Sequence, residues 1–193
     1  MMKYPNFTAG DGEFLLNIIG GWEKFQQIKT GVLTLVVKAS DLLKLVVTVT
    51  ASAVTGFSAK ETFGATKPAI RLWYLGDNFK NHFLGKVEEN IQAEFLAIHT
   101  LTKDSLDAPI LAQLGDRAET SLAHFWELLT KQANGEKGTL LTNGYTNIFY
   151  IKDANGTLWA VGAGWHAVNG WNVSTDSVGN PYGWYAGPQV VSR

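Results

Sequence analysis

The sequence contains no cysteine. This absence excludes disulfide bonds, thiolate nucleophiles, cysteine-ligated zinc and iron–sulfur clusters. The fold must therefore rest on packing and hydrogen bonds, and 193 residues with 46% hydrophobic and 17% charged side chains are sufficient for an ordered core. We expect one domain over residues 1–193, with a possible subdivision into a β-rich part, 1–75, and a helix-plus-β part, 76–193.

An excess of charge of one sign is also lacking. The chain has 16 lysines and arginines against 17 aspartates and glutamates, and the basic residues are scattered singly. A phosphate backbone or an anionic membrane surface is attracted by clustered positive charge. We therefore expect neither nucleic-acid nor membrane binding, and the partner is an unknown protein or polymer.

Long apolar runs are lacking as well. The most apolar stretch, residues 30–54, is interrupted by Lys38, Asp41 and Lys44, and cannot form a continuous membrane helix. Near the start, residues 14–19 are too short and too interrupted for a signal-peptide core. The expected location is the cytoplasm.

Short catalytic and cofactor motifs are absent. The sequence has no Gly-x-Ser-x-Gly, no His-Glu-x-x-His, no phosphate-binding loop and no complete dinucleotide fingerprint, so we expect neither a cofactor nor a metal. The remaining candidates for acid–base chemistry are His166 and His99, with Asp176 as the carboxylate. Their residue types permit this chemistry, but their spacing does not support it.

The N-terminal part is rich in β-branched residues. Strands are predicted at 32–37 and 45–51, joined by a turn at Ser40-Asp41, with the second strand half-buried on alternate residues. Two further strands are predicted at 56–65 and 69–75. Together they predict a meander of three or four strands.

Two helices are predicted after this meander. The first begins at Asp77, and its apolar stripe comprises Phe79, Phe83, Val87 and Ile91. The second begins at Asp116, contains an ion pair between Glu127 and Lys131, and ends at Asn134-Gly135. Its apolar stripe comprises Ala118, Leu122, Phe125 and Leu129. Between the helices, an interior strand is predicted at 95–101, followed by a turn-rich segment, 104–109.

The C-terminal part predicts a second meander. Strands at 148–151 and 158–161 are joined by a turn with Asn155-Gly156, a third strand follows at 171–175, and a short one at 189–191. The predicted fold class is α+β: a largely antiparallel sheet, with an N-terminal meander and an aromatic-rich C-terminal meander, packed against two main helices.

Aromatic residues are concentrated in this C-terminal part. The candidate binding residues are Trp165, Trp171, Tyr182, Trp184 and Tyr185. Two prolines and two glycines within residues 180–188 prevent regular structure, and a loop cannot easily bury three rings. At least one of Tyr182, Trp184 and Tyr185 is therefore expected to be accessible, so replacing Trp184 and Tyr185 should weaken binding while changing stability little.

Three functions follow from these patterns. The leading hypothesis is a non-catalytic binding domain that contacts a protein or polymer through the aromatic C-terminal loop. The second is an enzyme without a short motif that uses the histidines and Asp176. The third is a subunit of a homomeric assembly, in which the strand at 189–191 or the strand at 32–37 pairs across chains.

Overall fold

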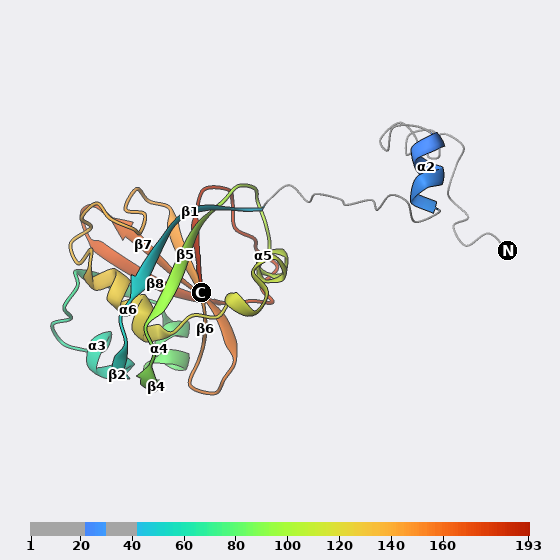
Figure 1. Cartoon of the computed structure of the whole chain (residues 1–193). Helices are drawn as coiled ribbons and strands as arrows, with labels where there is room; N and C mark the ends of the chain where they lie inside the picture. The colour runs from blue at the N-terminus through green and yellow to red at the C-terminus, as the bar shows by residue number, and fades with distance from the viewer. Residues whose placement is uncertain (1–21, 30–41) are drawn as a thin grey trace. The chain divides into compact units, whose positions relative to one another are not determined.

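The computed structural model describes residues 22–29 and 42–193 (Figure 1). The chain divides into two units, residues 1–40 and 41–193, and each is described by itself. In the first unit, α2 (Trp22–Lys29) stacks Trp22 on Phe25 with ring centroids 5.3 Å apart. The strand predicted at 32–37 lies outside the described residues.

The second unit has an α+β fold, as predicted from the sequence. A mostly antiparallel, mixed sheet of seven strands has the order β1-β5-β9-β6-β7-β8-β3. Its strands are β1 (Leu43–Ala51), β3 (Leu72–Leu75), β5 (Glu94–Leu101), β6 (Thr146–Lys152), β7 (Leu158–His166), β8 (Gly170–Ser177) and β9 (Gln189–Ser192). A separate two-stranded sheet pairs β2 (Val54–Ser58) with β4 (Val87–Ile91).

The predicted C-terminal meander is confirmed for its first three strands. Strands β6, β7 and β8 are consecutive antiparallel neighbours. Gly156 in the first turn has a φ of 82°, which glycine adopts without strain. Gly170 begins β8 with a φ of 120°, and a Cβ there would lie 2.2 Å from the carbonyl oxygen of Arg71. Local turn chemistry therefore fixes this part of the sheet.

The last strand, β9, has a position that the sequence did not indicate. It lies between β5 and β6, antiparallel to β5 and parallel to β6. Both of its edges are therefore paired within the chain. The prediction that this strand could pair across chains is wrong, because no free edge remains on it.

The predicted N-terminal meander is wrong for the strands from residue 43 onward, and its first pairing, 32–37 with 45–51, lies outside the described residues. Strand β1 pairs with β5, β2 pairs with β4, and β3 pairs in parallel with β8. The predicted strand 56–65 ends at Ser58, whose Oγ accepts from the backbone N–H of Glu61 at 3.4 Å and caps the short helix α3 (Ala59–Thr62). Long-range partners thus override the local preference for neighbouring strands to pair.

The first predicted helix is shorter than its apolar stripe. Helix α4 comprises Asp77–Phe83, whereas Val87 and Ile91 lie in β4. The chain reverses after Phe83, where the N–H of Lys86 donates to the Phe83 carbonyl at 2.8 Å. Residues 87–91 then pair with β2, so a strand replaces the last turns of the predicted helix.

The second predicted helix begins later than expected. Asp116 lies in a 3₁₀ turn, η1 (Gly115–Arg117), and helix α6 comprises Leu122–Thr130. Ser121 caps it by accepting from the N–H of His124 at 3.1 Å. The predicted ion pair between Glu127 and Lys131 is confirmed at 2.7 Å.

A further helix, α5 (Asp107–Leu114), replaces part of the segment that we predicted as turn-rich. Pro109 lies in its first turn, where a backbone N–H has no partner within the helix. The proline and the two nearby aspartates therefore mark the start of a helix and not only a turn.

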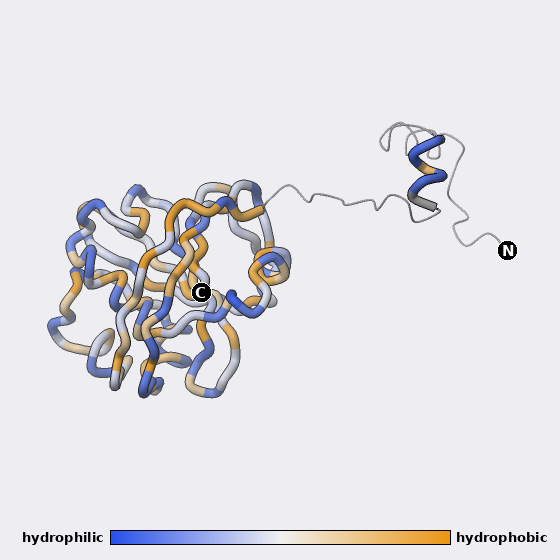
Figure 2. Tube along the Cα trace, viewed as in Figure 1, coloured by the Kyte–Doolittle hydropathy of each residue, from blue (hydrophilic) through white to orange (hydrophobic). Residues whose placement is uncertain are grey.

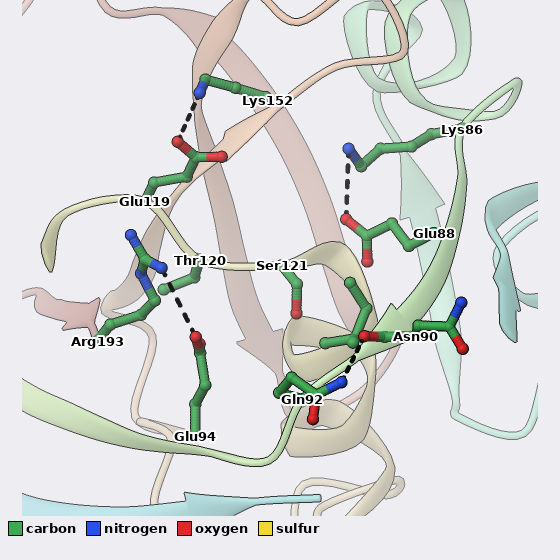
Figure 3. A pocket seen from close by; sticks show the side chains of 11 residues that line it. Lys86, Glu88, Asn90, Gln92, Glu94, Glu119, Thr120, Ser121, Lys152 and Arg193 are labelled. Carbon is green, nitrogen blue, oxygen red and sulfur yellow. Dashed lines mark hydrogen bonds and ion pairs between the residues drawn. The ribbon is translucent and has the colours of Figure 1, made fainter. Parts of the chain in front are cut away.

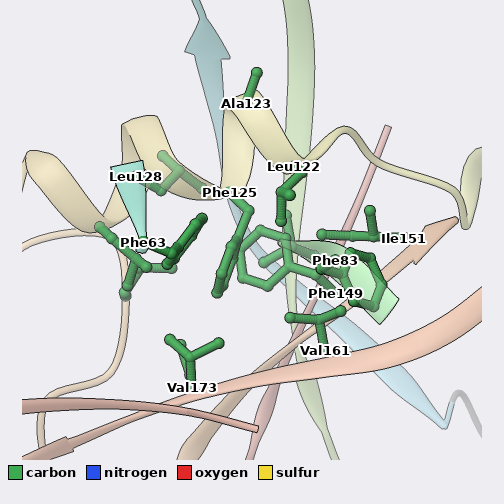
Figure 4. Packing of buried hydrophobic residues seen from close by; sticks show 14 of the residues in the cluster. Phe63, Phe83, Leu122, Ala123, Phe125, Leu128, Phe149, Ile151, Val161 and Val173 are labelled. Carbon is green, nitrogen blue, oxygen red and sulfur yellow. The ribbon is translucent and has the colours of Figure 1, made fainter. Parts of the chain in front are cut away.

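The core lies on both faces of the seven-stranded sheet. On one face, α4 and α6 pack a large cluster of phenylalanines, including Phe63, Phe83, Phe125 and Phe149 (Figure 4). On the other face, α5 places Ile110 and Leu114 in a smaller cluster. Strand β6 contributes alternate residues to the two clusters, as a sheet covered on both sides requires. Val178 and Trp184 of the C-terminal segment pack against the same smaller cluster as α5.

Candidate functional site

The C-terminal loop, residues 180–188, exposes two aromatic rings. Tyr182 is 82% exposed and Tyr185 is 81% exposed, whereas Trp184 between them is half-buried. The expectation that at least one of these rings is accessible is therefore met by both tyrosines. We call this segment, residues 180–188 with the rings of Tyr182, Trp184 and Tyr185, the aromatic loop.

Trp184 anchors this loop to the fold. Its indole Nε1 donates to Oδ1 of Asp107, the first residue of α5, at 2.7 Å. The hydroxyl of Tyr150 donates to the same oxygen at 2.7 Å. The ring also lies over β7, where a Cβ on Gly162 would come within 3.9 Å of the indole. Trp184 therefore points inward and holds the loop in place.

The backbone of the aromatic loop is tied to the segment that precedes α5. Ser105 and Trp184 exchange two hydrogen bonds, of 2.9 and 2.7 Å, as in a short antiparallel bridge. The N–H of Ala186 donates to Asp104 Oδ1 at 2.8 Å, and the N–H of Tyr182 donates to Asn180 Oδ1 at 3.0 Å. These bonds fix the loop before any ligand arrives.

An open hollow of about 530 Å³ lies between the two segments. Its lining residues are Asp104, Ser105, Leu106, Tyr182, Gly183, Trp184 and Tyr185. The volume is in the range of small-ligand sites. Asp104 is the charged side chain of this lining, so the hollow favours a ligand with flat apolar faces and hydroxyl or cationic groups over an anionic one.

The anchor beneath the loop has an unusual electrostatic environment. Burial raises the pKa of Asp107, an effect that the hydrogen bonds from Trp184 and Tyr150 oppose and the charge of Asp176 reinforces. Burial and the neighbouring carboxylate also raise the pKa of Tyr150, so its hydroxyl keeps its proton and remains a donor. A buried carboxylate with two donors is the polar link between loop and core.

The two tryptophans predicted as binding residues lie in the core region. Trp171 is fully buried, and its Nε1 donates to the Gln132 carbonyl at 2.8 Å. Trp165 is half-buried and packs edge-on against Trp171 with ring centroids 5.4 Å apart. Trp171 is therefore closed to a partner, whereas part of the Trp165 surface remains accessible.

The structure does not bring His166, His99 and Asp176 together. His166 pairs with Gly170 at one end of β7 while Asp176 pairs with Ala160, six residues or about 20 Å away along that strand. His99 lies on β5, four strand spacings or about 19 Å from Asp176 on β8. Burial lowers the pKa of His99, which keeps the ring neutral. Asp176 instead lies near Asp107.

A second hollow, of about 380 Å³, lies beside the start of α6 (Figure 3). Three ion pairs line it: Lys86 with Glu88 at 3.3 Å, Lys152 with Glu119 at 2.8 Å, and Arg193 with Glu94 at 3.6 Å. Glu88 also accepts from the backbone N–H groups of Leu122 and Ala123, at 3.0 and 2.8 Å. These charges neutralise one another and stabilise the start of the helix.

The described residues show neither a metal centre nor a membrane helix. Within 22–29 and 42–193, no three His, Asp or Glu side chains gather in a way that could hold a metal ion. None of the helices in these ranges is long and apolar enough to cross a membrane.

Two residues of the site were missed by sequence reasoning, Asp107 and Tyr150. Asp107 follows a turn-rich segment and Tyr150 lies in an ordinary apolar strand, so neither carries a local signal of its role. Asp107 lies 43 residues before Tyr150 and 77 residues before Trp184, so its two hydrogen bonds arise only when these distant segments fold together. The predicted loop aromatics were the part that composition could find.

Comparison with known proteins identifies no relative of this chain. No family model matches the chain, and no curated protein and no solved structure is significantly similar to it.

Proposed function

We propose that this chain is a non-catalytic binding domain that contacts a protein or polymer through the aromatic loop. The observation that carries the proposal is the exposure of Tyr182 and Tyr185, both above 80%, on a loop whose backbone is already hydrogen-bonded to the fold. Large exposed rings are uncommon on protein surfaces and are enriched where partners bind.

Preorganisation of the loop favours tight contact. A flexible loop must lose conformational freedom on binding, which weakens the complex by about 0.5–1.5 kcal/mol for each side chain that becomes ordered. Here Trp184 is fixed by Asp107, and Ser105 pairs with its backbone. A ligand that stacks on Tyr182 and Tyr185 therefore meets a backbone that is already ordered and has only the two tyrosine side chains left to order.

The tyrosines are the residues to change in a test. We expect the double variant Tyr182→Ala/Tyr185→Ala to bind at least about 10-fold more weakly, because truncating an aromatic residue that is central to an interface costs about 1 kcal/mol or more. Its melting temperature should stay within about 2 °C of the natural chain, because exposed side chains add little to stability. Tryptophan fluorescence, titrated separately with chitohexaose and with a decaproline peptide, measures binding through the neighbouring Trp184.

The matched control is Tyr74→Ala, which removes an exposed tyrosine on β3, away from the loop. It should bind either probe as the natural chain does. Equal responses from the double variant and the natural chain would contradict the proposal. A natural chain that responds to neither chitohexaose nor decaproline would contradict the polymer part of the proposal.

A further inference from the structure

The two edges of the seven-stranded sheet differ greatly in length. Strand β3 forms one edge with four residues, and β1 forms the other with nine. Within residues 22–29 and 42–193, β1 has one strand partner, β5 (Figure 1). Every second residue of an edge strand directs its N–H and C=O away from the sheet. Among the described residues, no strand pairs with these groups along β1 after Leu43, whose carbonyl accepts from Gln113.

The side chains of this edge are unusually apolar for an exposed strand. Leu45, Val46 and Val47 are three consecutive exposed aliphatic residues, with Val46 54% exposed. Phe95 on the adjacent β5, paired with Thr50, is 72% exposed. Figure 2 shows apolar residues along both strands. Such a run on an edge strand is a hazard for aggregation unless another strand covers it.

The usual protection of an edge strand is confined to the start of β1. Natural edges carry lysines, prolines or bulges that prevent pairing. Here the exposed Lys44 and a bulge at Val46 lie at the start of the strand, but the stretch from Val47 to Ala51 contains only Val, Thr and Ala. After the bulge, Val47 to Ala51 pairs with β5 in regular register. This stretch is therefore competent to pair on its outer side.

The composition of the edge suits a second copy of itself. An antiparallel pair related by a two-fold axis places residues of the same stretch opposite one another. Because Leu45 to Ala51 carries no charge, no register within it places like charges together. Centred on Val49, such a pair places Thr48 opposite Thr50 of the other copy, and Val47 opposite Ala51. Both pairings are favourable in sheets.

We infer that β1 is a homodimer interface, in which β1 of two chains pairs antiparallel and extends the sheet across a two-fold axis. This inference is independent of the proposed function, since β1 and the aromatic loop are different surfaces. A dimer would carry two aromatic loops, so a polymer with repeated sites would gain avidity without any new contact.

Light scattering after size-exclusion chromatography of the full chain tests this interface. Between about 1 and 200 µM, the mass should rise from 21.1 kDa toward twice that value. Thr48→Lys places a charge on an exposed side chain in the centre of the edge and should hold the mass at 21.1 kDa throughout. Val168→Lys, at an exposed apolar residue in the turn between β7 and β8, should leave the dimer intact.

Circular dichroism melting of Thr48→Lys at low concentration should match the natural chain, which separates a lost interface from a lost fold. Amide hydrogen exchange supplies a second readout, because Thr48 and Thr50 should be protected only at dimer concentrations. A monomer at every concentration, a trimer or larger species, or a dimer that survives Thr48→Lys would overturn the inference. Edge protection that does not depend on concentration would also overturn it.

Discussion

Replacing Trp184 with alanine is expected to lower the free energy of unfolding by about 3 kcal/mol. The indole lies over Gly162, packs against the smaller core cluster, and supplies one of the two side-chain hydrogen bonds to the buried carboxylate of Asp107. Removing it leaves a cavity and takes a donor from that carboxylate. This differs from the expectation drawn from the sequence, that the Trp184 position contributes little to stability.

Chemical denaturation followed by circular dichroism measures this effect. Tyr185→Ala, in the same loop, is the control and should change the unfolding free energy by about 0.5 kcal/mol or less, because the Tyr185 ring is exposed. Trp184→Phe should fall between the two, since it keeps a ring over Gly162 but loses the N–H. A Trp184→Ala variant as stable as Tyr185→Ala would show that the indole is not an anchor.

The sequence predicted the elements whose signals are local. Gly156 and Gly170 have the positive φ angles that their turns require, and the C-terminal meander was predicted from them. The ion pair between Glu127 and Lys131 follows from helical spacing alone. In contrast, the boundary of α4 at Phe83 depends on the pairing of β4 with β2, which no window of residues reveals.

Strand pairing between distant segments was beyond the sequence. A short apolar run such as 189–191 looks the same whether it forms an edge or lies between β5 and β6, as it does here. The parallel pairing of β3 with β8 joins segments about 100 residues apart and has no local signature. The strands themselves were therefore easier to predict than their neighbours.

The candidate site was predicted in the same uneven way. Prolines and glycines between residues 180 and 188 predicted a loop with solvent-exposed aromatic rings. Tyr182 and Tyr185 are indeed exposed. The division of labour within the loop was not predictable, because Trp184 turns inward only where Asp107 lies beneath it. The composition of the loop predicted the exposed surface, whereas the contact with Asp107 determines that Trp184 is the ring that holds the loop.

Two substitutions of Asp107 are expected to separate the contribution of its hydrogen bonds to stability from the contribution of its charge. Asp107→Ala should lower the unfolding free energy by about 3 kcal/mol at neutral pH, because the Trp184 indole and the Tyr150 hydroxyl both lose their acceptor. Asp107→Asn keeps an oxygen that can accept both bonds and removes the buried charge, so at neutral pH it should be at least as stable as the natural chain.

The pH dependence gives this prediction a sign. Because burial raises the pKa of Asp107, the folded state holds a proton that the unfolded state has already lost, and stability falls as pH rises from about 4 through the raised pKa. Asp153 and Glu127 act in the opposite direction. Burial raises the pKa of each carboxyl group, but hydrogen bonds lower it by more, so both pKa values are lowered and the stabilisation is lost in acid. Subtracting the stability of Asp107→Asn from that of the natural chain cancels these shared contributions. The difference in unfolding free energy should become less favourable to the natural chain as pH rises and should then level off. Chemical denaturation at several pH values measures this difference. A difference that stays constant with pH would show that the charge of Asp107 does not destabilise the folded state.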